Sequence, residues 1–209
     1  MINTTLLRQG RWLPAIVFMT AVIACSDPEA TLSTLDTDAV ILAFGDSLTY
    51  GTGAGRENGY PARLATMTKR EVINAGNPGE LSAAGRERLP GLLARHRPDL
   101  VILCHGGNDI LRQRSADTAA ANLTAMIRMI RDSGSEVLLI AVPEPGLFPS
   151  AASFYSDVAR ETGTPIIVDA LADILSSPAL KADAVHPNKS GYAELAQAIM
   201  TKLQDTGAL

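Results

Sequence analysis

The chain has 209 residues, of which 46% are hydrophobic and 19% are charged, and this is enough apolar material for one domain with a sizeable core. Its 18 basic and 22 acidic side chains give a formal net charge of −4, without any basic run interleaved with aromatic residues. We therefore expect no nucleic-acid partner, since binding to a phosphate backbone needs clustered positive charge.

The first 24 residues have the pattern of a secretory signal sequence. Arg8 and Arg11 supply positive charge, and the following run at residues 13–24 is almost entirely apolar. A single membrane-spanning anchor is the alternative, but this run falls short of the roughly 20 apolar residues that a spanning helix needs. Loss of the predicted leader would leave 16 basic and 22 acidic residues, a net charge of −6.

The end of this leader, Val22-Ile23-Ala24-Cys25, resembles a bacterial lipobox. The resemblance implies that Cys25 is lipid-modified after cleavage, with an uncleaved signal of the non-lipoprotein kind as the alternative. Ser26, in place of an aspartate, then implies an outer-membrane lipoprotein facing the periplasm. Residues 25–38 read as this cysteine and a short polar tether, so the domain is expected over residues 39–209.

The second cysteine, Cys104, lies in the apolar run from Leu100 and is interpreted as a buried thiol that packs as a small hydrophobe. A disulfide between Cys25 and Cys104 is the alternative in an oxidising compartment, although it would prevent lipidation. The two cysteines do not have the spacing of metal ligands.

From residue 40 onward, short apolar runs alternate with amphipathic patterns. The predicted strands are Val40–Phe44, Val72–Asn74, Leu100–His105, Glu136–Val142 and Pro165–Asp169. The predicted helices are Leu81–Arg95, Asp117–Asp132, Ala152–Thr162 and Ser190–Leu203, two of them stopped by Gly134 and Gly163. This alternation predicts an α/β fold in which a parallel sheet is covered on both faces, a three-layer α/β/α sandwich.

Polar residues follow the ends of these predicted strands. Ser47 comes after the first strand, Asn77-Pro78-Gly79 after the second, His105 to Asp109 after the third, and Asp183 with His186 after the fifth. Because the carboxyl ends of parallel strands lie at one edge of the sheet, we expect these residues to meet there.

The residue types at this edge fit nucleophilic acyl transfer. A neutral His186 could take the proton of Ser47, while Asp183, three residues earlier, could orient the imidazole. The Ser47 N–H, the Gly79 N–H and the Asn108 amide could stabilise the oxyanion, and this chemistry needs neither metal nor cofactor. Taken singly, each residue has an ordinary alternative: a helix cap at Asp46 or Ser47, a surface histidine, a solvated loop carboxylate, or turn residues.

Four segments together resemble the sequence blocks of the GDSL/SGNH hydrolases, closest to the bacterial thioesterase, arylesterase and lysophospholipase group. They are Gly45-Asp46-Ser47-Leu48, Gly79 with the residues before it, Gly107-Asn108-Asp109 and Asp183-Ala184-Val185-His186-Pro187. The resemblance implies Ser47, Asp183 and His186 as catalytic residues and Ser47, Gly79 and Asn108 as the oxyanion hole. It also implies a flavodoxin-like sheet of five parallel strands.

Two positions depart from the group's pattern. Glu80-Leu81 follows Gly79 where relatives often carry Asp-Thr, which predicts that the oxyanion loop is held differently. His105 precedes Gly106 where a small, apolar or acidic residue is more usual, and we interpret it as a histidine satisfied by hydrogen bonds at the strand end. A role near the substrate is the alternative for His105.

The predicted activity is hydrolysis of small-molecule carboxylic esters with short to medium acyl chains, with thioesters or lysophospholipids as further candidates. Leu147 and Phe148, in a proline-rich segment beside the edge, are expected to line the substrate pocket rather than to pack the loop. The rival functions are removal of acetyl groups from carbohydrate or envelope polysaccharide, and a catalytically silent lipoprotein that binds lipid or a partner. Nothing in the sequence specifies the oligomeric state.

Overall fold

The computed structural model describes Met1 and residues 30–209. Its centre is a parallel five-stranded sheet in the order β2-β1-β3-β4-β7. The strands are β1 (Val40–Gly45), β2 (Glu71–Gly76), β3 (Leu100–Cys104), β4 (Glu136–Ile140) and β7 (Ile166–Ile167). This order, with β1 between β2 and β3, is that of flavodoxin-like sheets. The predicted fold class is thereby confirmed.

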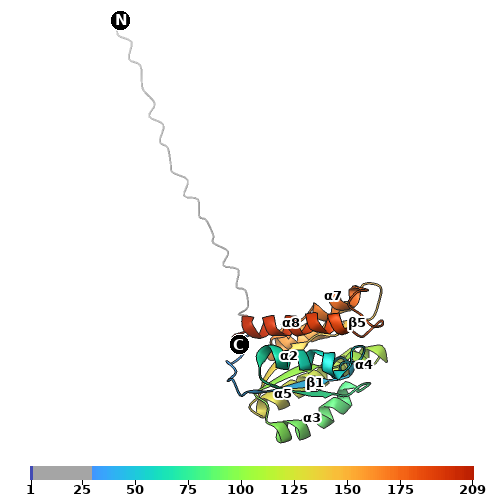
Figure 1. Ribbon diagram of the computed structural model, residues 1–209. Coiled ribbons are helices and arrows are strands. Elements are labelled where there is room, and N and C mark those ends of the chain that lie inside the picture. The colour runs from blue at the N-terminus through green and yellow to red at the C-terminus, as the bar shows by residue number, and fades with distance from the viewer. Residues whose placement is uncertain (2–29) are drawn as a thin grey trace.

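Helices cover both faces of the sheet (Figure 1). One layer contains α2 (Tyr60–Thr68), α7 (Ala170–Ser176) and α8 (Lys189–Asp205), and the other contains α3 (Ser82–His96), α5 (Ala116–Asp132) and α6 (Phe154–Thr162). Two short helices, α1 (Ser47–Tyr50) and α4 (Gly107–Leu111), directly follow strands, and a 3₁₀ turn spans Arg56–Asn58. A small antiparallel hairpin is formed by β5 (Pro143–Glu144) and β6 (Ser150–Ala151).

The core lies where the apolar patterns predict it. All five residues of β3 are fully buried, as expected for a central strand with helices on both faces. In α5 the predicted stripe of Leu123, Met126, Ile127 and Ile130 is completely buried against the sheet layer. Cys104 is a buried free thiol, and burial raises its pKa well above the ordinary value.

Several elements have no counterpart in the sequence prediction, among them α2, α7 and the β5–β6 hairpin. Helix α2 buries only Tyr60, Pro61, Leu64 and Thr68, too few apolar side chains for a clear periodic signal. The predicted strand Pro165–Asp169 is reduced to Ile166–Ile167, because Asp169 is already the N-cap of α7.

The folded domain begins earlier than the predicted boundary at residue 39. Leu32 and Leu35 are 7% and 6% exposed and belong to the core. The Leu32 N–H donates to Thr206 O (3.0 Å) and the Leu35 N–H donates to Ala208 O (2.9 Å), so this segment pairs with the C-terminal end of the chain. The predicted leader, Cys25 and the first part of the tether lie outside the described residues.

None of the helices within the described residues combines the length and the apolarity that spanning a bilayer requires.

Candidate active site

Ser47 is the first residue of α1, immediately after the turn that ends β1. Glycine is needed before this turn, because a Cβ on Gly45 would lie 2.0 Å from Cys104 O. The helix is capped by Asp46, whose Oδ1 accepts from the Leu48 N–H at 3.0 Å. Ser47 is therefore not the capping residue, and its hydroxyl instead lies 3.0 Å from His186 Nε2.

His186 is held between Ser47 and Asp183. Its Nδ1 lies 2.8 Å from Asp183 Oδ2, and because a carboxylate only accepts, Nδ1 carries the proton. In the neutral imidazole, Nε2 then has a lone pair facing the Ser47 hydroxyl. Asp183 Oδ1 also accepts from the Val185 and His186 N–H groups, both at 2.8 Å.

Asp183 is a carboxylate, and the neighbouring imidazole favours this charged form. Partial burial raises its pKa, but the hydrogen bonds from the Val185 N–H and from His186 outweigh that effect, and the pKa ends below its ordinary value. An ionised Asp183 fixes the tautomer of His186 and would stabilise an imidazolium.

Backbone hydrogen bonds join the two ends of the loop that carries Asp183 and His186. The Ala182 N–H donates to His186 O (2.9 Å), next to a bridge between Lys181 and Pro187. The Asn188 side chain caps α8 through the Ser190 N–H (2.9 Å) and also donates to Ala179 O (2.8 Å). Sequence reasoning missed this role of Asn188 because the helix was expected to begin at Ser190, whereas α8 begins at Lys189, and an asparagine directly before a helix is a capping residue.

Asn108 lies in α4, the short helix that follows β3. Its Nδ2 donates to Asp46 Oδ2 at 3.0 Å, which leaves the second hydrogen of the amide for another acceptor. Asp46 is 1% exposed, and burial raises its pKa, an effect that is partly offset by nearby His105 and by its hydrogen bonds. Asp46 therefore both caps α1 and orients the Asn108 amide.

Gly79 lies in the exposed turn after β2, with a φ of +79° that favours glycine. The turn is tied to the end of β1 by the Asn77 N–H, which donates to Gly45 O at 3.0 Å. It is tied to the end of α4 by Arg112, whose Nη2 donates to Gly79 O at 3.1 Å. Gly79 is thus placed beside the Ser47 turn but is absent from the lining of the cleft.

Ser47, Asn108 and His186 open into one cleft of about 440 Å³, a volume that includes open solvent at its mouth. Apolar side chains dominate the rest of the lining: Leu48, Leu111, Val142, Pro143, Pro145, Pro149, Leu175, Ala184 and Val185. Sequence reasoning did not identify Leu111, Val142 or Leu175, since nothing in an apolar pattern separates a cleft residue from a core residue.

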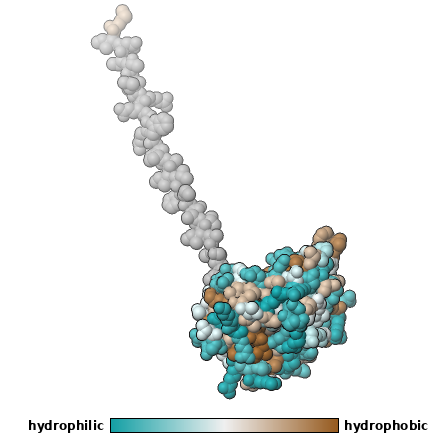
Figure 2. All heavy atoms as spheres, in the orientation of Figure 1, coloured by the Kyte–Doolittle hydropathy of each residue, from teal (hydrophilic) through white to brown (hydrophobic). Residues whose placement is uncertain are grey.

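Leu147 and Phe148, which the sequence placed in the substrate pocket, do not line the cleft in this structure. Both side chains are 87% exposed at the tip of the β5–β6 hairpin, and neither lines the cleft. Only the base of the hairpin, with Pro143, Pro145 and Pro149, reaches the cleft, because the antiparallel pairing carries the tip away from it. Figure 2 shows an apolar projection from the otherwise hydrophilic surface at this end of the molecule.

His105 is fully buried and does not line the cleft. Its ring nitrogens lie within hydrogen-bond distance of the Gly106 N–H (2.9 Å) and of Glu80 Oε2 (3.1 Å). The interpretation of His105 as a histidine satisfied at the strand end is therefore confirmed. Among residues 30–209 no three His, Cys, Asp or Glu side chains gather in a way that could hold a metal ion.

Comparison with known proteins connects this geometry to a family. Over 172 residues the chain is 27% identical to the thioesterase 1/protease 1/lysophospholipase L1 of Escherichia coli, covering 78% of this chain and 83% of that protein. It is 35% identical to an arylesterase of Vibrio mimicus over 123 residues, 56% of this chain and 60% of that protein. The crystal structure of TesA superposes with a TM-score of 0.73 at 28% identity, covering 80% of this chain and 99% of that one.

The match to a family description covers most of the described domain. Residues 43–194, which contain every residue of the candidate site, match the GDSL-like lipase/acylhydrolase family. The chain therefore belongs to the GDSL-like lipase/acylhydrolase family and is an enzyme of the esterase and lipase type.

Proposed function

We propose that this enzyme is a serine esterase in which Ser47, His186 and Asp183 act as a catalytic triad. The observation that carries the proposal is the continuous hydrogen-bond chain from Asp183 Oδ2 to His186 (2.8 Å) and from His186 Nε2 to Ser47 Oγ (3.0 Å). These are hydrogen-bond distances at which an imidazole can take the proton of a serine hydroxyl.

The reaction follows from this order of groups. Ser47 Oγ forms a bond to the acyl carbon while its proton passes to His186 Nε2, and the carbonyl oxygen becomes an oxyanion. The imidazolium, stabilised by Asp183, then gives the proton to the departing alkoxide. In the second half a water molecule attacks the acyl-enzyme with His186 as base, and the carboxylic acid leaves as Ser47 regains its proton.

Three donors are proposed for the oxyanion: the Ser47 N–H, the Gly79 N–H and the Asn108 amide. A single preorganised donor of this kind contributes about 2.7–4 kcal/mol to stabilising the transition state. The hydrogen bond to Asp46 supports the assignment of Asn108, because it fixes the orientation of the amide before substrate binds.

The substrates that we propose are carboxylic esters with short to medium acyl chains, with thioesters and lysophospholipids as further candidates of the same chemistry. The apolar lining of the cleft supports an acyl chain over a sugar, which would need many more polar partners. The names of the relatives, a thioesterase/lysophospholipase and an arylesterase, agree with this class.

The decisive experiment is labelling with a fluorophosphonate, followed by mapping of the modified peptide. We expect the label on Ser47 alone, and no labelling of Ser47→Ala. A label on another serine, or turnover of p-nitrophenyl esters by Ser47→Ala, would contradict the proposal.

We also propose that the enzyme is exported and held in the outer membrane through a lipidated Cys25, facing the periplasm. The charged and apolar leader with its Val22–Cys25 sequence supports this. Mass spectrometry of the mature N-terminus is expected to show Cys25 carrying acyl chains, and Cys25→Ser to leave unprocessed precursor or release soluble protein. An unmodified Cys25 at the mature N-terminus, or cleavage elsewhere in the wild type, would refute the anchor.

A further inference from the structure

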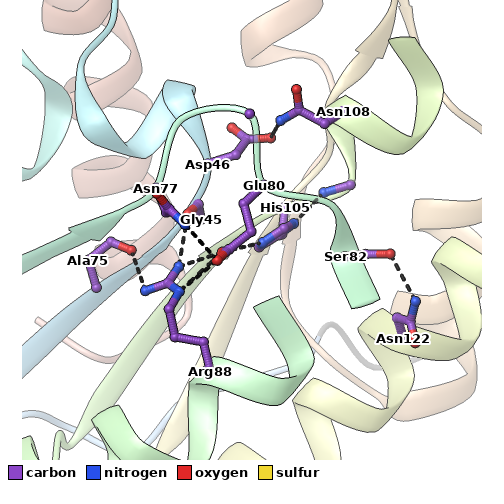
Figure 3. Close-up of polar contacts among 12 residues, drawn as sticks. Gly45, Asp46, Ala75, Asn77, Glu80, Ser82, Arg88, His105, Asn108 and Asn122 are labelled. Atoms are coloured by element: carbon purple, nitrogen blue, oxygen red, sulfur yellow. Dashed lines mark hydrogen bonds and ion pairs between the residues drawn. The ribbon is translucent and has the colours of Figure 1, made fainter. Parts of the chain in front are cut away.

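Glu80 is a buried carboxylate that none of these catalytic steps uses. It directly follows Gly79 and is 8% exposed, although Gly79 itself is exposed. Its oxygens accept from Arg88 (Nη2 to Oε2, 2.6 Å; Nε to Oε1, 2.9 Å), from His105 Nε2 (3.1 Å) and from Asn77 Nδ2 (2.8 Å). Figure 3 shows these side chains converging on the carboxylate. We call Glu80, Arg88 and His105 the Glu80 cluster.

Arg88 connects Glu80 to the ends of two neighbouring strands, β2 and β1. It projects from α3, and its Nη1 donates to Ala75 O in β2 at 3.1 Å. Its Nη2 also reaches Gly45 O at the end of β1, at 3.4 Å, and its guanidinium lies 4.5 Å from the centroid of the Phe44 ring. Glu80 is thereby fixed relative to the strand that leads into Ser47.

His105 connects Glu80 to the end of β3. The Gly106 N–H donates to Nδ1, so that nitrogen has no proton, and Nε2–H is the donor to Glu80. The imidazole occupies space that α3 leaves free, since a Cβ on Gly85 would lie 2.3 Å from Nε2. The Tyr155 hydroxyl donates to His105 O at 2.7 Å and holds the backbone of the same residue.

These contacts place the residue after Gly79 at the junction of β2, β1 and β3, the three strands whose ends surround Ser47. We propose that the Glu80 cluster is a positioning device that holds the Gly79 N–H where it donates to the oxyanion, and so controls turnover without touching the substrate. This inference rests on the proposed function, because it assumes an oxyanion formed by attack of Ser47.

Stability alone does not explain such a cluster. Burying an ion pair costs desolvation, and well-packed apolar residues of similar volume are often as stable or more so. A bidentate contact with arginine does fix the orientation of a carboxylate, because the planar guanidinium pairs with both carboxylate oxygens in one plane. Burial raises the Glu80 pKa, but the bonds from His105, Arg88 and Asn77 lower it to about 2, so the carboxylate is charged at neutral pH.

The test is Glu80→Gln, which keeps the shape of the side chain but removes its charge. Because the Gly79 N–H would act only on the transition state, we expect kcat to fall by about 10-fold or more while KM stays within about 2-fold. The inhibition constant of a trifluoromethyl ketone, which forms a tetrahedral adduct with a serine, should rise by the same factor as kcat falls. Rates are taken per active site titrated with fluorophosphonate, so that only folded enzyme is counted.

The matched control is Arg70→Gln. Arg70 also donates to backbone carbonyls, those of Leu35 and Asp36 (both 2.8 Å), but it lies at the opposite end of the sheet. We expect this variant to lower the melting temperature and to leave kcat and the inhibition constant unchanged. A Glu80→Gln enzyme that behaved like the Arg70→Gln enzyme would overturn the proposal.

A second variant, Arg88→Lys, covers the case in which Glu80→Gln does not fold. The lysine keeps a positive charge beside Glu80 but cannot reach Ala75 O and Gly45 O together. We therefore expect kcat and the inhibition constant to change in the same directions as in Glu80→Gln, by smaller factors. Unchanged values would refute the positioning role of the Glu80 cluster. Ser47→Ala, assayed in parallel, keeps the two proposals separate. Turnover retained by Ser47→Ala refutes the triad itself, whereas turnover lost there but retained by Glu80→Gln refutes only the positioning role.

Discussion

The two ends of the central sheet differ in the hydrogen bonds that their side chains make. At the end that carries α4 and β5, to the right in Figure 1, several side chains bond to one another as well as to the backbone. Ser47 meets His186, His186 meets Asp183, and Asn108 meets Asp46. The Glu80 cluster lies beneath them in the same end of the molecule.

At the opposite end, near the C-terminus, side chains mainly secure the backbone. Asp99 Oδ2 accepts from the Val40 N–H at 2.7 Å, and the Ser135 hydroxyl donates to Pro98 O at 2.6 Å. Arg70 donates to the carbonyls of the segment that carries Leu35. Each of these contacts fixes where a strand or the N-terminal segment begins.

This contrast separates side chains with a proposed role in the reaction from side chains that secure the backbone. Bonds between two side chains make up only about 10–15% of the hydrogen bonds in folded proteins, so their concentration at one end of a sheet is informative. Such a pair needs two specific residues at once, whereas a backbone carbonyl accepts from any suitable donor. Substitutions at the first end should therefore change turnover, and those at the second end should change stability.

The largest effect is expected from the triad. Ser47→Ala and His186→Ala should each lower kcat by about 10⁴-fold or more, because nucleophile and base act as a unit. The double variant should lose little further activity. Steady-state kinetics on p-nitrophenyl esters measures this, and losses that multiply in the double variant would show that the two residues act independently.

Asn108→Ala tests whether the side-chain pairs serve the transition state. The variant should lose about 10²–10³-fold in kcat with little change in KM, because the charge that the amide stabilises arises only after attack. It should also cost about 1–2 kcal/mol of stability, since buried Asp46 loses a hydrogen bond. A lower melting temperature with unchanged kcat would instead show that Asn108 only stabilises the turn.

The pH dependence of kcat/KM should reflect deprotonation of His186. The base works only when neutral, so kcat/KM should rise by up to about 10-fold per pH unit within the range of about 5 to 8 where histidines titrate. Asp183 stays ionised throughout that range because its pKa is lowered. A profile that is flat across these pH values would exclude a histidine base.

A substitution at the opposite end should separate stability from turnover. Asp99→Ala removes the acceptor of the Val40 N–H and should lower the unfolding free energy by about 1 kcal/mol. Its kcat and KM should equal those of the wild type, because the start of β1 is a whole strand away from Ser47. Denaturant unfolding and ester kinetics on the same preparation measure both quantities, and a fall in kcat would break the distinction between the two ends.

Much of the fold could be predicted from the sequence, because its signals are local. The run Val40–Phe44 and the stripe of α5 each report their own burial, and a parallel sheet brings the residues after its strands to one edge. Helix α2 was not predicted, because its burial depends on packing against α8 rather than on an apolar periodicity in its own sequence.

The residues of the site likewise differ in how far the sequence predicts them. Ser47, His186 and Asp183 could be proposed because their chemistry is recognisable in the residue types and their order. The partners of Glu80 could not, because Arg88 reaches it from α3 and His105 from the loop after β3, and no spacing in the sequence indicates that these residues meet. The lining of the cleft was equally hidden, since Val142 and Leu175 resemble core residues.

The smallest effect is expected from the hairpin tip, although it lies at the catalytic end of the sheet. In the double variant Leu147→Ser and Phe148→Ser, kcat/KM for a short soluble ester should stay within about 2-fold of the wild type, because both side chains are 87% exposed and lie outside the cleft. The melting temperature should not fall, since replacing exposed apolar side chains costs no buried area. Pro145→Ser is the informative comparison, because Pro145 does line the cleft at the base of the same hairpin, and its replacement should raise KM. If the tip variant raised KM as much as Pro145→Ser does, the hairpin would fold over the bound substrate, and the two apolar residues would belong to the pocket after all.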